Sequence, residues 1–453
     1  MRKAMCPHRL HLLASAIAVL TFLSTPLSFG EDAILEATRS EFQKIPIWVM
    51  GFSPVEQDKK ISETMNTQVE SVLKEDLQRS QVFSVADLPS TKGEFSQNKC
   101  VSLSPTLETQ FSKVTVSTWG RLGIGGTSNG VEGLIFDACA FDPGHQDVLT
   151  GKRYFSLKTN DALLRLMAHR WADELVYRYT GERGIARTKI AFVGEKENGR
   201  ELFVMDYDGY DPQQVTADGY LNLMPTWSPD RKFLIYTGYR DRKQQIMRRE
   251  LATGHEEVLV PPASLNITAT FAPDGQSITY AGAQEGNSDI YQLALDSGSA
   301  KQLTSHHSAD LSPSWSPDGR HVAFTSDRGG RPQIYIMDAD GSNVKRLTYD
   351  GDYNAAPAWS PKGEWIVYVC RIPGEGFKLC RISPNGEQRS QITKGNSIDD
   401  SPSWAPNGRH LVFSSIRGGE SQIYIVTSEG AGLEKISSVG AHLSSPSWSP
   451  FQP

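Results

Sequence analysis

The sequence lacks three features that would define a membrane, nucleic-acid or metal-binding protein. Its longest apolar run, residues 12–23, is twelve residues long, whereas a membrane-spanning helix needs about 20. The 46 basic residues are outnumbered by 52 acidic ones, a net charge of −6, and nucleic-acid binding requires a basic surface. Cysteine is scarce, with five in 453 residues and no CxxC pair, so neither a zinc cluster nor a redox dithiol is supported.

The residues that are present indicate a folded chain rich in turns. The hydrophobic share is 38%, and the 39 glycines bring the apolar content close to the globular average, which excludes a chain disordered throughout. Those glycines and the 25 prolines are scattered along the chain. Evenly spaced turn residues are typical of an all-β protein.

The first thirty residues have the three-part pattern of a secretory signal peptide. Arg2, Lys3 and Arg9 precede the apolar run, and Ser28-Phe29-Gly30 places small residues at positions −3 and −1 of a cleavage site. We therefore predict a cleavable signal over residues 1–30, with a retained membrane anchor as the weaker alternative. Cleavage removes three basic residues and no acidic ones, which changes the net charge from −6 to −9.

Four cysteines remain after cleavage: Cys100, Cys139, Cys370 and Cys380. An even number in an oxidising compartment permits disulfides. Cys100 can pair with Cys139, whereas Cys370 and Cys380 are expected about three positions out of line across a hairpin. Four free, partly buried thiols are an equally open alternative.

A motif built on Trp-Ser-Pro-Asp-Gly recurs six times in the second half of the chain. Its first residues are separated by 44, 44, 44, 45 and 44 positions, namely Trp227, Phe271, Trp315, Trp359, Trp404 and Trp448. Proline, Asp or Asn, and glycine in this order favour a type I turn. Alternating segments such as 322–326 and 333–338 follow each turn and predict strands. Four short strands in 44 residues are typical of one β-propeller blade.

The two ends of the repeat region predict how the ring closes. The last motif supplies one inner strand, and the three missing strands lie before the first motif, at 190–193, 202–206 and 214–216. Pairing of the C-terminal strand with strands near residue 190 removes an open sheet edge. We therefore predict a six-bladed β-propeller over residues 185–453.

Residues 31–184 lack the repeat and predict a small α/β domain. Strands are expected at 45–52, 112–119, 131–141 and 153–159, with a polar loop at 93–110. A second helix is capped by Asn160 or Asp161 and ends near Gly181. Apolar residues at three- and four-residue steps mark the inner faces of the two helices: Ile61, Met65, Val69, Val72, Leu73 and Leu77 in the first, and Leu164, Met167, Trp171 and Leu175 in the second.

No motif carries enough chemistry to predict catalysis, a metal or a cofactor. Residues 126–130 match G-x-S-x-G around Ser128, but a strand-like segment follows where a hydrolase needs a helix. Residues 206–209 and 338–341 resemble the start of a calcium loop, with glycine in the wrong position. His306-His307 is interpreted as an exposed loop pair.

The segments that link each blade to the next are the best candidate for a functional surface. In a propeller, six such linkers gather around one mouth of the central channel. Here they mix carboxylates, amides and apolar groups, which suits a protein-docking rim, although solvated loops without a partner are the alternative. The candidate rim residues are Leu265, Thr268, His307, Asp310, Leu311, Asn354, Asp399 and Asp400.

Taken together, these features resemble the TolB family of the Tol–Pal envelope system over nearly the whole chain. The resemblance rests on the signal, the α/β domain, the six motifs and residues 172–176. The most specific part is the junction 180–193, TGERGIARTKIAFV, where the family has a similar T-G-x-x-G-x-x-x-T-[RK]-I-A stretch.

The resemblance implies a non-catalytic, monomeric periplasmic protein, held at the envelope by partners rather than by a membrane anchor. Family members bind the peptidoglycan-associated lipoprotein Pal at the channel mouth and help maintain outer-membrane integrity and constriction at division. By position, Leu265, Thr268 and Leu311 fall where the family contacts Pal. The family's amino-terminal segment engages TolA; the matching region is 31–44, including Ile34-Leu35-Glu36-Ala37-Thr38.

Two other functions stay open from the residues alone. One is a peptidase whose propeller gates a hydrolase domain. Residues 31–184 are few for such a domain, and its candidate nucleophile would be Ser128. The other is a propeller that binds a small molecule in its channel.

Overall fold

The computed structural model describes residues 43–55, 63–89, 91, 95–96, 99–100, 111–126, 132–283, 287–437, 440 and 442–452. The chain divides into two compact units, Met1–Leu35, outside the described residues, and Glu36–Pro453. The predicted signal peptide therefore lies outside the described residues. Among the helices that are described, none is both long and apolar enough to cross a membrane.

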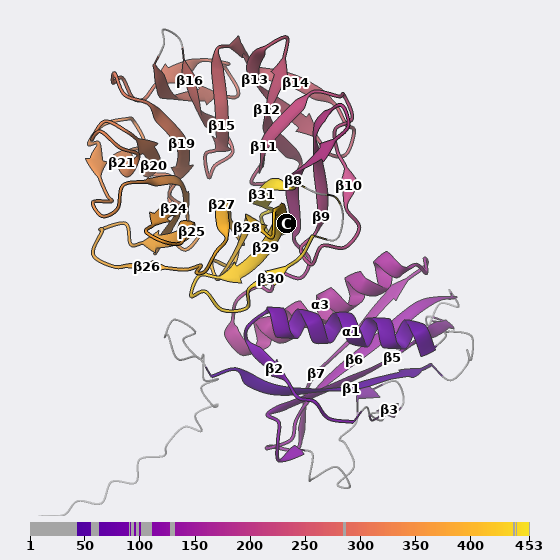
Figure 1. The fold of residues 1–453 in the computed structure, drawn as a ribbon. Helices are drawn as coiled ribbons and strands as arrows, with labels where there is room; N and C mark the ends of the chain where they lie inside the picture. Colours follow the sequence, from indigo (N-terminus) through magenta and orange to yellow (C-terminus); the bar gives the residue numbers. More distant parts are fainter. Residues whose placement is uncertain are drawn as a thin grey trace, which may run out of the picture. The chain divides into compact units, whose positions relative to one another are not determined.

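The first region of the larger unit, which we call the α/β region, is built on a five-stranded sheet (Figure 1). β1 pairs in parallel with β2 and β5, and the β5–β6 and β6–β7 pairs are antiparallel. Along the sheet the strands are β2 (Phe83–Val85), β1 (Ile45–Pro54), β5 (Val116–Gly126), β6 (Glu132–Asp142) and β7 (Asp147–Ser156). β5 begins later and β7 earlier than the sequence predicts. A separate pair, β3 (Phe95–Ser96) and β4 (Lys99–Cys100), lies in the segment expected to be a loop.

Two helices, α1 (Glu63–Arg79) and α3 (Asp161–Thr180), pack on the same face of this sheet (Figure 1). The Asn160 side chain caps α3 by accepting from the backbone N–H of Leu163, and Gly181 ends it in the left-handed conformation. The predicted inner residues of both helices lie in one hydrophobic core, except Ile61, which is outside the described residues.

The opposite face of the sheet has its own aromatic core, formed around Trp48, Trp119 and Phe141. Cys100 joins this core through a disulfide to Cys139, with 5.9 Å between their Cα atoms. The pairing considered possible from the sequence is thus present.

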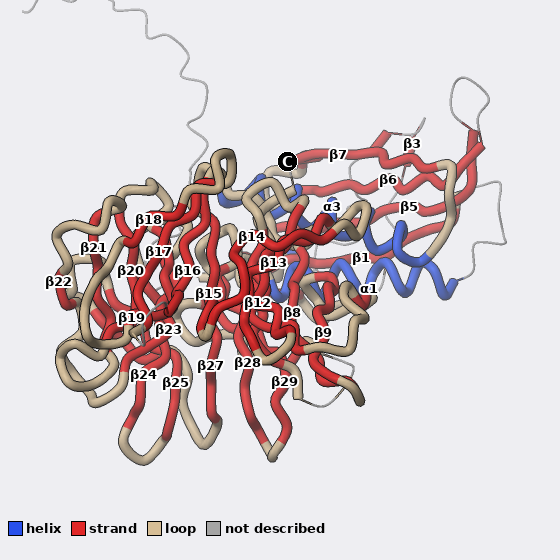
Figure 2. Tube along the Cα trace, turned by 90° about the horizontal axis from the view of Figure 1, so that it is seen from above, coloured by secondary structure: helices blue, strands red, loops and turns tan. Residues whose placement is uncertain are grey.

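The remaining strands form the propeller region, drawn entirely as strands and loops in Figure 2. Four sheets have four strands each and one sheet has eight, in which β14-β13-β12-β11 continues into β9-β8-β31 and β10 pairs with β9. The eight-stranded sheet contains β8 (Lys189–Lys196), β9 (Gly199–Asp206), β10 (Gln213–Gln214), β11 (Leu221–Trp227), β12 (Phe233–Arg240), β13 (Lys243–Glu250), β14 (Glu256–Ala263) and β31 (Ser444–Trp448).

The four-stranded sheets follow one another along the chain. The first two are β15 (Leu265–Phe271), β16 (Ser277–Ala283), β17 (Ser288–Ala294) and β18 (Ala300–Gln302), then β19 (Asp310–Trp315), β20 (His321–Ser326), β21 (Gln333–Asp338) and β22 (Lys345–Arg346). The last two are β23 (Asn354–Trp359), β24 (Ile366–Ile372), β25 (Gly376–Ile382) and β26 (Arg389–Gln391), then β27 (Ile398–Trp404), β28 (His410–Arg417), β29 (Glu420–Thr427) and β30 (Glu434–Lys435).

Each recurring motif ends an inner strand, and the first five copies form the turn that follows it. In the third copy, the Gly319 N–H bonds the Ser316 carbonyl at 3.0 Å, and Gly319 has φ of 69°. The Ser316 hydroxyl also donates to Asp318 at 2.6 Å. The local turn chemistry read from the sequence is therefore the one observed.

The six inner strands contact one another in a closed order, β11-β15-β19-β23-β27-β31 and back to β11. Motif tryptophans link neighbours in this ring: Trp227 donates to the Ser447 carbonyl at 3.0 Å and Trp404 to the Ala358 carbonyl at 2.9 Å. β31 also pairs antiparallel with β8, with Trp448 opposite Ile190. The C-terminal strand thus pairs near residue 190, as expected.

Every inner strand contains a β-bulge that the sequence analysis did not predict. In each one the pairing register shifts just before the motif. The residue three positions before the aromatic has positive φ, between 49° and 54°, although none is glycine. Such a backbone costs about 1–3 kcal/mol per residue, so the surrounding ring must hold it. The six residues are Met224, Thr268, Ser312, Ala356, Ser401 and Ser445.

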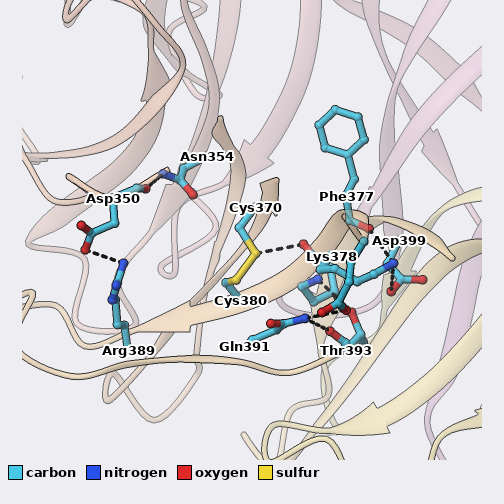
Figure 3. Close-up of a disulfide and its surroundings, with 12 residues drawn as sticks. Asp350, Asn354, Cys370, Phe377, Lys378, Cys380, Arg389, Gln391, Thr393 and Asp399 are labelled. Carbon is cyan, nitrogen blue, oxygen red and sulfur yellow. Dashed lines mark hydrogen bonds and ion pairs between the residues drawn. A yellow bond between two sulfur atoms is a disulfide. The ribbon is translucent and has the colours of Figure 1, made fainter. Parts of the chain in front are cut away.

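The second disulfide, between Cys370 and Cys380, joins β24 to β25 (Figure 3). Cys370 is paired with Lys378 across the hairpin, so Cys380 lies two positions further along rather than three. The expected misalignment was wrong by one position because this repeat, from Trp359 to Trp404, is 45 residues long, one residue longer than the repeat before it. Their Cα atoms are 5.8 Å apart, within reach of a disulfide.

Candidate functional site at the channel mouth

The inner strands enclose a channel with a volume of about 620 Å³. All six positive-φ residues line it, together with proline rings and the hydroxyl groups of serine and threonine. Among the described lining residues, Asp400 is the one that carries a charge. The channel wall therefore combines apolar groups with hydroxyl groups and is nearly uncharged.

The predicted rim residues differ widely in exposure. His307 and Asp400 are exposed, and Leu265, Thr268 and Leu311 are half-buried. Thr268 also has a structural role, since its hydroxyl accepts from the backbone N–H of Ser312 at 3.2 Å on the neighbouring inner strand.

Asp310 is a buried ion-pair partner rather than an exposed rim charge. Its side chain is fully buried, and the Arg328 guanidinium donates to its Oδ2 at 2.8 Å. Reversing this charge would place two like charges together in the interior. Reversing the charge of Asp310, a predicted rim residue, should therefore cost stability.

Asp399 is buried in the same way (Figure 3). It accepts from the Ser415 hydroxyl at 2.6 Å, and Lys378 Nζ lies 3.9 Å from its Oδ2. Reversing the charge of Asp399, also a predicted rim residue, should therefore cost stability as well. Asn354 is also buried, and its amide donates to Gln333 at 2.9 Å. These side chains support the rim from below.

Four apolar side chains near the linkers are exposed and were not among the predicted rim residues. Leu221 is 38% exposed and Ile398 is 47% exposed, each as the first residue of an inner strand. Ile416 lies directly opposite Ile398 across the β27–β28 pair, and Tyr220 precedes Leu221. The Arg240 guanidinium covers the Tyr220 ring at 4.4 Å. We call these four residues the exposed rim set.

The other predicted features are placed as follows. The His306 and His307 rings lie 4.1 Å apart in a loop. Ser128 and the segment Ile34, Leu35, Glu36, Ala37 and Thr38 lie outside the described residues.

One cluster in the described part of the chain has ligand atoms close enough for a metal ion, namely Asp76, His169 and Asp208. Its carboxylates already accept from the Tyr207 hydroxyl and the Arg165 guanidinium. The positive charge that a metal would supply is therefore provided by an arginine.

Comparison with known proteins assigns the propeller region. A family model described as the TolB beta propeller domain matches residues 176–452. The chain is 31% identical over 253 residues to the Tol-Pal system protein TolB of Methylobacillus flagellatus, which covers 56% of this chain and 55% of the relative. It is 30% identical over 172 residues to the protein of that name from Mannheimia succiniciproducens, which covers 35% of this chain and 39% of the relative. The chain thus spans about half the length, or less, of these curated relatives.

A solved structure extends the likeness beyond the propeller. The crystal structure of TolB from Acinetobacter baumannii superposes with a TM-score of 0.76 at 27% identity, which covers 90% of this chain and 97% of that one. The family model alone covers more than half of the chain, including every motif copy. The chain therefore belongs to the TolB propeller family.

Proposed function

We propose that this protein is a non-catalytic, protein-binding scaffold of the Tol–Pal system. Its membership of the TolB family and relatives named Tol-Pal system proteins support this role. We further propose that residues 1–30 direct export to the periplasm. The mature monomer is then held at the envelope by its partners, without a membrane anchor of its own.

We propose a division into an α/β domain, residues 31–184, and a six-bladed propeller, residues 185–453. The closed order of six inner strands supports this blade count. The eight-stranded sheet then represents two blades, the first of which takes β31 from the end of the chain as its inner strand.

The partner that we propose for the channel mouth is the lipoprotein Pal. The observation that carries this proposal is the exposed rim set, because apolar side chains such as Ile398 and Leu221 stay in water at the linkers. An apolar patch bordered by polar groups is typical of a docking surface. His307, Asp400, Leu265, Thr268 and Leu311 would complete the contact, while Asp310, Asn354 and Asp399 would shape it from beneath. Docking there would support outer-membrane integrity and constriction at division.

Titration calorimetry with the soluble part of Pal tests this surface. Ile398→Lys and Leu221→Lys should each weaken binding about tenfold or more, since interface anchors cost about 2 kcal/mol when lost. Leu433→Lys is a matched control, because Leu433 is 44% exposed but lies in the β29–β30 turn, at the other end of the strands. Unchanged affinity in both rim variants would refute the site.

We also propose that the segment 31–44 engages TolA, with Ile34, Leu35, Glu36, Ala37 and Thr38 at its centre. If Pal favours one arrangement of this segment over another, the two binding events are thermodynamically linked. Deleting residues 31–44 should then change the affinity for Pal. An identical dissociation constant with and without the segment would exclude the linkage.

A further inference from the structure

Five polar residues form a buried cluster between the α/β region and the propeller region, both within the compact unit Glu36–Pro453. Asp76 comes from α1, and Arg165 and His169 come from α3. Tyr207 and Asp208 come from the turn that follows β9. We call these residues the junction cluster.

His169 lies between the two carboxylates of this cluster. Its Nδ1 is 2.6 Å from Asp76 Oδ2, and its Nε2 is 3.9 Å from Asp208 Oδ2 and has no hydrogen-bond partner. The Tyr207 hydroxyl donates to the other Asp76 oxygen at 2.5 Å. Both His169 and Asp76 are 3% exposed, so water does not screen the charges.

The surrounding charged groups are paired with arginines. Arg165 donates to Asp208. Arg79 of α1 bonds Glu434 of β30 at 2.9 and 2.6 Å and lies 3.7 Å from Glu75. Arg187 bonds Asp173 of α3 at 2.8 Å. Among the residues that the structure describes, His169 is the side chain that can supply a positive charge to Asp76 within hydrogen-bond distance.

The electrostatic environment favours the imidazolium form. Burial by itself would lower the pKa of His169, but the charge and hydrogen bond of Asp76 and the charge of Asp208 outweigh it, so the pKa is raised. A protonated ring also gives Nε2 a proton to direct at Asp208. The cluster therefore joins one carboxylate from each region through one proton-dependent cation.

We propose that protonated His169 clasps the α/β region to the propeller region, and that loss of its proton loosens this junction. The proposal is independent of docking at the channel mouth. It predicts that the junction responds to pH while the folded core of each region does not.

The direction of the response follows from proton linkage. A histidine whose pKa is raised by folding contributes stability that is fully present below about pH 6.5 and is lost as pH rises through the folded-state pKa. The contact that His169 makes between the two regions should therefore weaken as the pH rises above the folded-state pKa of His169.

A second buried histidine, His410, lies at the same junction, and its contribution to stability changes with pH in the opposite direction. His410 Nε2 bonds the Arg79 carbonyl at 2.9 Å, and burial lowers its pKa to about 4. Its contribution is present above about pH 6.5 and declines as pH falls toward 4. The junction should thus be tightest near neutral pH.

Hydrogen–deuterium exchange of the full chain at about pH 6 and about pH 9, corrected for intrinsic exchange rates, tests the clasp. Peptides covering 70–79 and 206–211 should lose protection by about tenfold per unit of pKa shift at the higher pH. His169→Gln should abolish this loss of protection at the higher pH. His145→Gln should preserve it, because His145 is also paired with a carboxylate, Asp142, but is 85% exposed and lies within one region.

Three outcomes would overturn the clasp. One is equal corrected protection of the wild-type peptides at both pH values, and another is a loss of protection at the higher pH that persists in His169→Gln. The third is a large gain of protection on adding Zn²⁺, which would make a metal the bridging cation. If His169→Gln fails to fold, the exchange of the wild type and of Asp208→Asn at the two pH values tests the proposal instead. Asp208→Asn should reduce the pH dependence of protection. An unchanged pH dependence in Asp208→Asn would reject the proposal.

Discussion

Two neighbouring repeats place different chemistry at the same three buried positions. In the neutral repeat, Gln333 Oε1 accepts from the Thr348 hydroxyl at 2.7 Å and from the Asn354 amide at 2.9 Å. In the charged repeat, the equivalent positions hold Lys378, Thr393 and Asp399. Lys378 is fully buried and donates to the Ser397 carbonyl and hydroxyl (Figure 3).

The comparison shows that the repeat requires a satisfied polar link between sheets rather than particular residues. Neutral amides provide the link at a small desolvation cost, whereas buried ions provide it with a large cost that good geometry must offset. The two repeats should therefore respond differently to the loss of one partner. Burial lowers the pKa of Lys378, which agrees with a free-energy cost for burying its positive charge.

The largest effect should come from breaking the charged link on one side. Asp399→Ala leaves the ammonium of Lys378 buried without its carboxylate and should cost about 3–5 kcal/mol in the free energy of unfolding. Urea unfolding followed by tryptophan fluorescence measures it. The exposed neighbour Asp400 gives the control. Asp400→Ala should change the free energy of unfolding by no more than about 0.5 kcal/mol. A loss below about 1 kcal/mol for Asp399→Ala would contradict the distinction.

The disulfide of the charged repeat should contribute next. Cys370 and Cys380 are ten residues apart, and replacing both by serine should cost about 2–4 kcal/mol by releasing the unfolded chain. Urea unfolding under non-reducing conditions gives the difference. An unchanged midpoint would show that hydrogen bonds alone hold this hairpin.

The neutral link should be less sensitive. Asn354→Ala removes one donor to Gln333 and should cost about 1–3 kcal/mol, the price of leaving a buried amide oxygen short of a partner. The same urea titration tests it beside Asp399→Ala. If Asn354→Ala proves the more damaging of the two, the charge argument fails.

The smallest change is expected when the charged link is converted into the neutral one. Lys378→Gln combined with Asp399→Asn removes both ions together and should leave stability within about 1 kcal/mol of wild type. A double-mutant cycle with the two single variants gives the coupling energy. A double variant as unstable as Asp399→Ala would mean that the charges themselves are required.

Local patterns predicted most of the fold. The Asn160 cap, the inner faces of both helices and the motif turns depend on residues close together in sequence, so single-sequence reasoning found them. The pairing of β31 with β8 was found because the repeat begins partway through one unit. The sequence did not predict the bulges because residues such as Thr268 and Ala356 do not favour positive φ.

The candidate site was predicted less well, for two physical reasons. The linkers were treated as loops, but Ile398, Asp399 and Asp400 begin β27 and alternate exposed, buried and exposed. Applying the two-residue period of a strand to them would have identified Asp399 as buried. The pairing of Asp310 with Arg328 depends on strand register, which one sequence does not specify.

Closure of the ring also constrains how the chain reaches its native state. The bond from Trp448 Nε1 to the Thr188 hydroxyl joins residues 260 apart in sequence. Each doubling of a loop adds only about 0.6 kcal/mol of closure entropy, so stability tolerates this distance, but non-local pairing slows folding. Until β31 emerges and pairs with β8, the edge of β8 stays open to other chains. The interval between synthesis of the first and last inner strands is therefore the period in which this protein is most prone to aggregate.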